Sequence, residues 1–172
     1  GRDRRSAMAN TSYVIALGSN RRHHRHGRPE RVLAAACAAL AERGLAIDTV
    51  APVFRTAAVG PAGRCFANSA AIVSTDLAPP ALLHLLKQVE RAFGRRRGRR
   101  WGPRVLDLDI ILWSGGRWAS PNLIVPHPAL TERRFVLDPA VRIAPDWRTD
   151  SRTIRHLHAR LRRTLAVDAF RP

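Results

Sequence analysis

Two aspartates in an apolar segment are the residues of this chain best suited to do chemistry. Asp107 and Asp109 are separated by one leucine in the segment 105–113. Side chains of a β-strand alternate between its two faces, so the two carboxylates are predicted to share one face. The other face is predicted to carry apolar side chains, namely Leu106, Leu108, Ile110 and Leu112. Two carboxylates on one face suit magnesium, which leaves coordination positions for phosphate oxygens.

The same spacing also occurs on the solvent-facing side of an amphipathic strand. Two properties of aspartate favour a metal site instead. Strands are depleted in aspartate, and neighbouring carboxylates on one face repel each other unless a positive charge lies between them. The sequence places such positive charge directly before the strand.

An arginine-rich segment, 94–104, precedes the aspartates and contains Arg95, Arg96, Arg97, Arg99, Arg100 and Arg104. A run of charge is usually a solvated loop. Here, however, three glycines leave the backbone free to fold over a ligand, and Trp101 offers a surface on which a flat ring can stack. Guanidinium groups bind phosphates through paired hydrogen bonds. The segment and the aspartates together predict a site for a metal-bound nucleotide.

Neither glycine motif that binds phosphate through the backbone is present. The chain has no Gly-x-x-x-x-Gly-Lys-Ser/Thr segment and no Gly-x-Gly-x-x-Gly segment after a predicted strand. The sequence therefore supports neither a P-loop nor a Rossmann site. If ATP is used, arginine side chains and metal must hold its phosphates.

The histidines fall into two groups. His23, His24 and His26 lie among four arginines in 21–28 and are predicted to form a solvated loop rather than a transition-metal site. His127 lies between two prolines that hold its backbone, and Arg133 follows. Such a histidine can simply form a turn, but a rigidly held polar ring near an arginine also suits a nucleotide contact.

The elements that must position these residues follow from hydrophobic periodicity and from glycine and proline signals. Strands are predicted over 13–17, 45–54, 68–75 and 105–113, and helices over 29–43, 79–93, 132–141 and 151–165. Gly44 and Gly94 end the first two helices, and Pro52 indicates an edge or a bulge. The order predicts an α+β, ferredoxin-like (βαββαβ) single domain with added C-terminal helices. Residues 1–11 are predicted to be a flexible extension and 12–168 the domain.

Composition narrows the classes of protein further. No apolar run reaches the roughly 20 residues that a membrane span requires, and two cysteines without metal-ligand spacing agree with a reducing compartment. We therefore predict a cytoplasmic protein without a membrane partner. The net charge of +17 attracts polyanions, although a high-GC genome that encodes arginine at tolerant surface positions explains most of it.

Six ordered segments resemble the 6-hydroxymethyl-7,8-dihydropterin pyrophosphokinases of folate biosynthesis, over about residues 13–165. They are Ala16-Leu17-Gly18-Ser19-Asn20; Phe54-Arg55-Thr56 with Val59-Gly60-Pro61; Phe66-Ala67-Asn68; Glu90 with Gly94-Arg95; Arg100-Trp101-Gly102-Pro103-Arg104 with Leu106-Asp107-Leu108-Asp109; and Val125-Pro126-His127 with Arg133 and Phe135. The resemblance implies a monomer that transfers pyrophosphate from MgATP to the pterin hydroxymethyl group and releases AMP.

The resemblance also implies roles for individual residues. Asp107 and Asp109 would hold two magnesium ions, and Arg95 and Arg104 would act with them in catalysis. ATP would be bound by Lys87, Glu90, Arg95, Arg97, Arg100, Trp101, Arg104, Ile110, His127 and Arg133. Lys87 stands where the family often has glutamine. The pterin would be bound by Thr56, Val59, Phe66, Asn68, Trp101 and Phe135, with Phe66 and Phe135 on the two sides of its ring.

Two other classes of protein fit parts of the sequence. A basic ferredoxin-like domain can be an RNA-recognition module, but those stack bases on sheet aromatics, and here the last strand carries aspartates. A partner-binding domain with a basic surface leaves the combination of aspartates and arginines unexplained. We therefore predict small-molecule substrates and no nucleic-acid partner.

Overall fold

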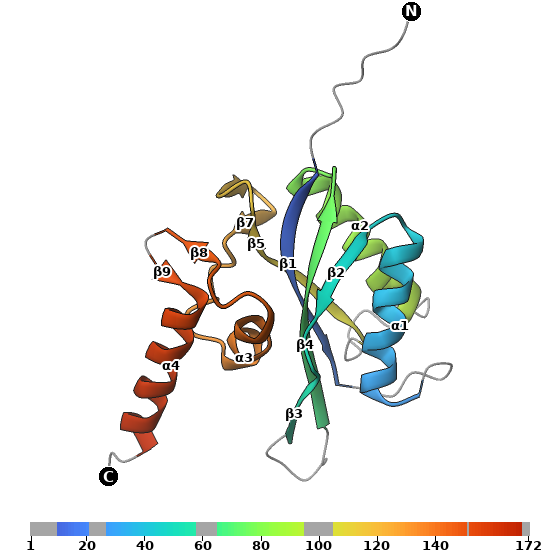
Figure 1. The fold of residues 1–172 in the computed structure, drawn as a ribbon. Coiled ribbons are helices and arrows are strands. Elements are labelled where there is room, and N and C mark those ends of the chain that lie inside the picture. Colours follow the sequence, from blue (N-terminus) through green and yellow to red (C-terminus); the bar gives the residue numbers. More distant parts are fainter. Residues whose placement is uncertain (1–9, 21–26, 58–64, 95–104, 151, 170–172) are drawn as a thin grey trace, which may run out of the picture.

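The computed structural model describes residues 10–20, 27–57, 65–94, 105–150 and 152–169. Its main sheet has five antiparallel strands, with helices on both of its faces (Figure 1). The strands are β1 (Thr11–Ser19), β2 (Ala46–Val50), β3 (Phe54–Ala57), β4 (Cys65–Thr75) and β5 (Asp107–Trp113). The helices are α1 (Pro29–Glu42), α2 (Pro79–Gly94), α3 (Arg134–Ile143) and α4 (Ile154–Ala169).

The strand order confirms the ferredoxin-like prediction. The order across the sheet is β2-β4-β1-β5, and β3 continues the β2 edge by pairing with the start of β4. The first strand thus lies between the third and fourth predicted strands, as the split βαβ arrangement requires. β1 is consequently the central strand between β4 and β5.

Helices cover both faces of this sheet. α1 and α2 pack on one face around the buried side chains Leu17, Leu40, Leu86 and Leu108. On the other face α3 packs against β4 and α4 packs on α3, and a second cluster there includes Val14, Ile111, Leu137 and Ile154 (Figure 1). We refer to these as the α1/α2 face and the α3/α4 face.

Several predicted boundaries were wrong. The strand predicted over 45–54 ends at Val50, because Pro52 has no N–H to continue the ladder, and a separate strand, β3, begins at Phe54. Ala51 still donates to the Ala70 carbonyl, at 2.8 Å, just before the break. Thr11 was assigned to the flexible extension but begins β1 and accepts a hydrogen bond from the Trp113 indole.

Leu112 lies on the opposite face from the one predicted. The β1–β5 register shifts between Val14 and Ile15, so that Ile15 pairs with Ile110 and Val14 with Leu112. Such a bulge places two successive residues on the same side of the sheet. Ile111 and Leu112 therefore both belong to the core on the α3/α4 face. The aspartates precede this bulge and keep the predicted alternation.

The chain after β5 differs most from the prediction. It forms two short hairpins, β6 (Trp118–Ser120) with β7 (Leu123–Val125) and β8 (Arg148–Thr149) with β9 (Arg152–Thr153). α3 begins two residues later than predicted and α4 extends to Ala169. Among the described residues, no helix combines the length and apolar character needed to cross a membrane.

Candidate active site

The strand register places three sequence-distant residues side by side. Gly18 on β1 pairs with Asn68 on β4 and with Asp107 on β5. Two residues earlier on β1, Ala16 pairs in the same way with Ala70 and Asp109. An amide and two carboxylates therefore flank β1 at two positions, Ala16 and Gly18, where it carries a small side chain or none.

These residues lie on the α3/α4 face. On β4, Ala67 and Ala71 belong to the core on the α1/α2 face, so Phe66, Asn68 and Ala70 point the other way. On β5, Leu108 is fully buried on the α1/α2 face, so Asp107 and Asp109 also point away from that core. Asp107 is exposed and Asp109 is half-buried, and the two share one face as predicted.

Gly18 keeps the space between Asn68 and Asp107 open. A Cβ added at Gly18 would lie 3.2 Å from Oδ1 of Asn68, closer than an ordinary contact. Gly18→Ala should therefore displace the Asn68 amide by a few tenths of an ångström. If Asn68 binds the pterin that the sequence resemblance implies, the KM for that pterin should rise several-fold while the melting temperature changes little. Steady-state kinetics at saturating ATP measure this, and an unchanged KM would show that Asn68 does not need its present position.

His127 is held from two sides. Its backbone N–H donates to the Ile111 carbonyl on β5 at 3.0 Å, and its Nδ1 accepts a hydrogen bond from the Ala129 N–H at 3.1 Å. The neutral ring therefore carries its proton on Nε2. Burial lowers the pKa of His127 below its ordinary value of 6.5, Asp109 acts to raise it and Arg133 acts to lower it. At neutral pH the ring is an Nε2–H donor beside Asp109.

The two charged neighbours should shift the His127 titration in opposite directions. Asp109→Asn removes a negative charge and should lower the pKa of His127, whereas Arg133→Met removes a positive charge and should raise it. NMR titration of the imidazole resonances measures both. Because burial lowers the folded-state pKa, this group stabilises the fold above about pH 6.5 and loses that contribution as the pH falls. Shifts of the opposite sign would contradict this arrangement of charges.

Two exposed aromatic side chains lie near the start of β4 and α3. Phe66 is 38% exposed and Phe135 is 46% exposed, although aromatic rings of this size usually lie in a core. Phe66 is on the α3/α4 face, and α3, which contains Phe135, packs against β4. The Arg133 guanidinium lies over the Phe135 ring, 5.5 Å from its centroid.

The carboxylates fit a magnesium ion that retains open coordination positions. Within the described part of the chain, no three His, Cys, Asp or Glu side chains are grouped so as to hold a metal ion. Asp107 and Asp109 share one face of β5, and two such carboxylates could hold magnesium while leaving positions for phosphate oxygens and water. Magnesium is commonly bound in this way, by one or two carboxylates and a substrate phosphate.

Three predicted nucleotide-binding residues lie elsewhere. Glu90 accepts a hydrogen bond from the Leu108 N–H and pairs with Lys87. Both extend from α2, which covers the opposite face of the sheet. Ile110 is 2% exposed and packs in that same core. Its side chain points away from the aspartates, so a contact there would have to use its backbone.

Several predicted residues lie outside the described residues, namely Val59, Arg95, Arg97, Arg100, Trp101 and Arg104. Thr56 is described by its backbone, which pairs with Phe66 in the β3–β4 ladder. Ala16 and Gly18, which lie between Asn68 or Ala70 on β4 and the aspartates on β5, stand in a family-like segment of the sequence but were assigned no role in the site. Two small residues at alternate positions of one strand are a usable signal. No pattern in the sequence indicates that the Ala129 N–H orients the His127 ring.

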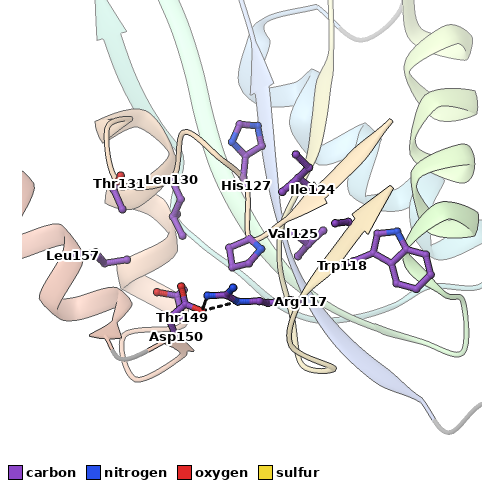
Figure 2. A pocket seen from close by; sticks show the side chains of 12 residues that line it. Arg117, Trp118, Ile124, Val125, His127, Leu130, Thr131, Thr149, Asp150 and Leu157 are labelled. Atoms are coloured by element: carbon purple, nitrogen blue, oxygen red, sulfur yellow. Dashed lines mark hydrogen bonds and ion pairs between the residues drawn. The ribbon is translucent and has the colours of Figure 1, made fainter. Parts of the chain in front are cut away.

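A hollow of about 430 Å³ lies beside this site (Figure 2). It is bounded by β6, β7 and the start of α4, with the Arg117–Asp150 ion pair at one end and His127 at the other. Among the predicted site residues that the structure describes, only His127 lines it. Arg117 and Asp150 already pair with each other. We therefore place the candidate active site at Asp107 and Asp109 on the α3/α4 face rather than in this hollow.

Residues 14–145 match the family described as 7,8-dihydro-6-hydroxymethylpterin-pyrophosphokinase (HPPK). The chain belongs to the HPPK family. A pyrophosphokinase of this family from Methylorubrum extorquens is 36% identical over 153 residues, which cover 88% of this chain and 94% of that protein. One from Bacillus subtilis is 41% identical over 138 residues, covering 79% of each chain.

Solved HPPK structures share the fold. The HPPK-DHPS protein of Plasmodium falciparum superposes with a TM-score of 0.71 at 13% identity, covering 95% of this chain and 48% of that one. Family membership makes the chain an enzyme, a pyrophosphokinase of folate biosynthesis, as the sequence resemblance predicted. ATP is the co-substrate that this activity implies.

Proposed function

We propose that the α3/α4 face, around Gly18, is where this HPPK-family enzyme transfers pyrophosphate from MgATP to 6-hydroxymethyl-7,8-dihydropterin. The pairing of Gly18 with both Asn68 and Asp107 carries this proposal. Neighbouring strands lie about 4.8 Å apart, so Asn68 and Asp107 are separated by roughly 10 Å across β1. That separation suits a pterin held at one end and the phosphates of ATP at the other.

The pterin is assigned to the β4 side. The Asn68 amide has both a donor and an acceptor, which can pair with the alternating polar edge of a pterin ring. Phe66 and Phe135 offer exposed aromatic surface for its two faces. Trp101 and the backbone of Thr56 and Val59 complete the proposed pterin contacts.

The phosphates are assigned to the β5 side. Asp107 and Asp109 would hold two magnesium ions, which when bound neutralise phosphate charge. His127 would donate its Nε2–H to a phosphate or ribose oxygen, and Arg133 would add a positive charge. The remaining proposed ATP contacts are Arg95, Arg97, Arg100, Trp101 and Arg104, together with the backbone of Ile110.

In the reaction, the pterin hydroxyl oxygen forms a bond to the β-phosphorus of ATP. The bond between that phosphorus and the oxygen bridging to the α-phosphate breaks, AMP leaves, and the hydroxyl proton is released. Such a transfer needs positioning and charge stabilisation rather than a covalent intermediate with the protein. Arg95 and Arg104 are proposed to stabilise the charge that develops on the transferred group.

The products distinguish this reaction from others. AMP should form from ATP only when hydroxymethyldihydropterin and magnesium are both present, which chromatography of the nucleotides measures directly. ADP as the product would indicate an ordinary kinase. No turnover together with tight, salt-dependent RNA binding would favour the nucleic-acid module.

The covered sheet argues against that module. RNA-recognition domains stack bases on an exposed sheet face, whereas here α1 and α2 cover one face and α3 packs against β4 on the other (Figure 1). We propose that the protein acts on small molecules as a cytoplasmic monomer, without nucleic-acid or membrane partners. Sedimentation analysis tests the monomer.

A further inference from the structure

Glu90 lies at the contact between α2 and β5, where a carboxylate needs a specific partner. Its side chain is 10% exposed. Oε1 accepts a hydrogen bond of 2.8 Å from the Leu108 N–H, and Lys87, nearly one helical turn earlier, lies 3.3 Å from Oε2. Glu90 therefore binds the backbone of the aspartate strand and has its own neutralising cation.

The Leu108 amide lies between the two aspartates in the chain. Its N–H belongs to the peptide unit that follows Asp107. β5 is the last strand of the main sheet, with β1 as its neighbour on one side. The Leu108 side chain is fully buried on the α1/α2 face. Holding both its amide and its side chain restricts rotation of the strand, and that rotation sets where the alternate side chains point.

We propose that Glu90, supported by Lys87, is a positioning residue that fixes the direction of Asp107 and Asp109 through the Leu108 amide. This inference rests on the proposed function, in which those aspartates hold magnesium. It gives Glu90 and Lys87 a role through the backbone, in place of the direct ATP contact that the family resemblance implies. Partners that orient metal-binding side chains typically change metal affinity about 10- to 100-fold when removed.

The test uses two substitutions of Glu90. Glu90→Gln keeps an oxygen acceptor for the Leu108 N–H, whereas Glu90→Met keeps the length of the side chain and removes the acceptor. Gln88→Met is the matched control, since Gln88 is exposed on α2 and bonds Arg43 and His84 instead. The measurements are hydrogen exchange of the Leu108 amide, binding of Mn²⁺ in the presence of a non-hydrolysable ATP analogue by electron paramagnetic resonance, and steady-state kinetics.

Glu90→Met should speed exchange of the Leu108 amide at least about 10-fold and weaken Mn²⁺ binding about 10-fold. The magnesium concentration for half-maximal rate should rise in parallel, and kcat at saturating magnesium should change less. Glu90→Gln and Gln88→Met should stay within about 3-fold of the unaltered enzyme in every measurement. Lys87→Met alters a partly exposed side chain and should weaken Mn²⁺ binding about 3-fold. This variant tests the inference if Glu90→Met does not fold.

Two results would overturn the inference alone. One is a raised KM for ATP in Glu90→Met at saturating magnesium with unchanged Mn²⁺ binding, which would indicate direct nucleotide contact. The other is equal damage by Glu90→Gln and Glu90→Met. Failure of the proposed function is recognised separately, because Asp107→Asn would then leave Mn²⁺ binding unchanged; that result would remove the basis of the inference as well.

Discussion

Asp107→Ala and Asp109→Ala are each expected to lower kcat by at least about 10³-fold while changing the melting temperature by no more than about 2 °C. A loss of this size corresponds to about 4 kcal/mol of transition-state stabilisation. The fold should tolerate both changes because Asp107 is exposed and Asp109 half-buried on the α3/α4 face. Removing one of two neighbouring carboxylates also relieves repulsion between them.

Kinetics over a range of magnesium concentrations, together with thermal unfolding, measure both effects. Asp76→Ala is the matched control, because Asp76 is exposed just after the end of β4 that lies away from Asn68. It should retain full activity. If instead the two site variants lost their cooperative unfolding transition, the aspartates would be structural residues rather than metal ligands.

Asn68→Ala is expected to lower kcat/KM for the pterin about 10- to 150-fold and to leave ATP binding unchanged. The substitution removes an amide that we assign to the pterin edge, and the loss of such hydrogen bonds costs about 1.5–3 kcal/mol. Binding of a non-hydrolysable ATP analogue, measured by calorimetry, should match that of the unaltered enzyme because Asn68 lies across β1 from the aspartates.

Asn10→Ala provides the control for this substitution. Asn10 is exposed and precedes β1, whereas Gly18 and Asn68 lie near the other end of that strand. Its removal should affect neither substrate. Equal losses of ATP and pterin binding in Asn68→Ala would place this amide outside the pterin site. Another residue would then have to bind the polar edge of the pterin ring.

Much of the fold could be predicted because the signals are local. The apolar spacing of α2 and the proline and glycine at the ends of α1 act within one or two helical turns, and both helices were predicted nearly to the residue. The hairpins after β5 were missed. Their strands have only two or three residues each, too few for an alternating pattern to appear.

By itself, the sequence determined that Asp107 and Asp109 share one face of a strand, because alternation depends only on neighbouring residues. It also carried enough motif similarity to indicate the family. Only the tertiary structure decided that Gly18 lies between Asn68 and Asp107, since register depends on the packing of the whole sheet. The same holds for the bulge that moved Leu112 and for the Leu108 amide that Glu90 binds. Contacts between distant segments depend on how two helical layers pack against five strands, and no local pattern encodes that.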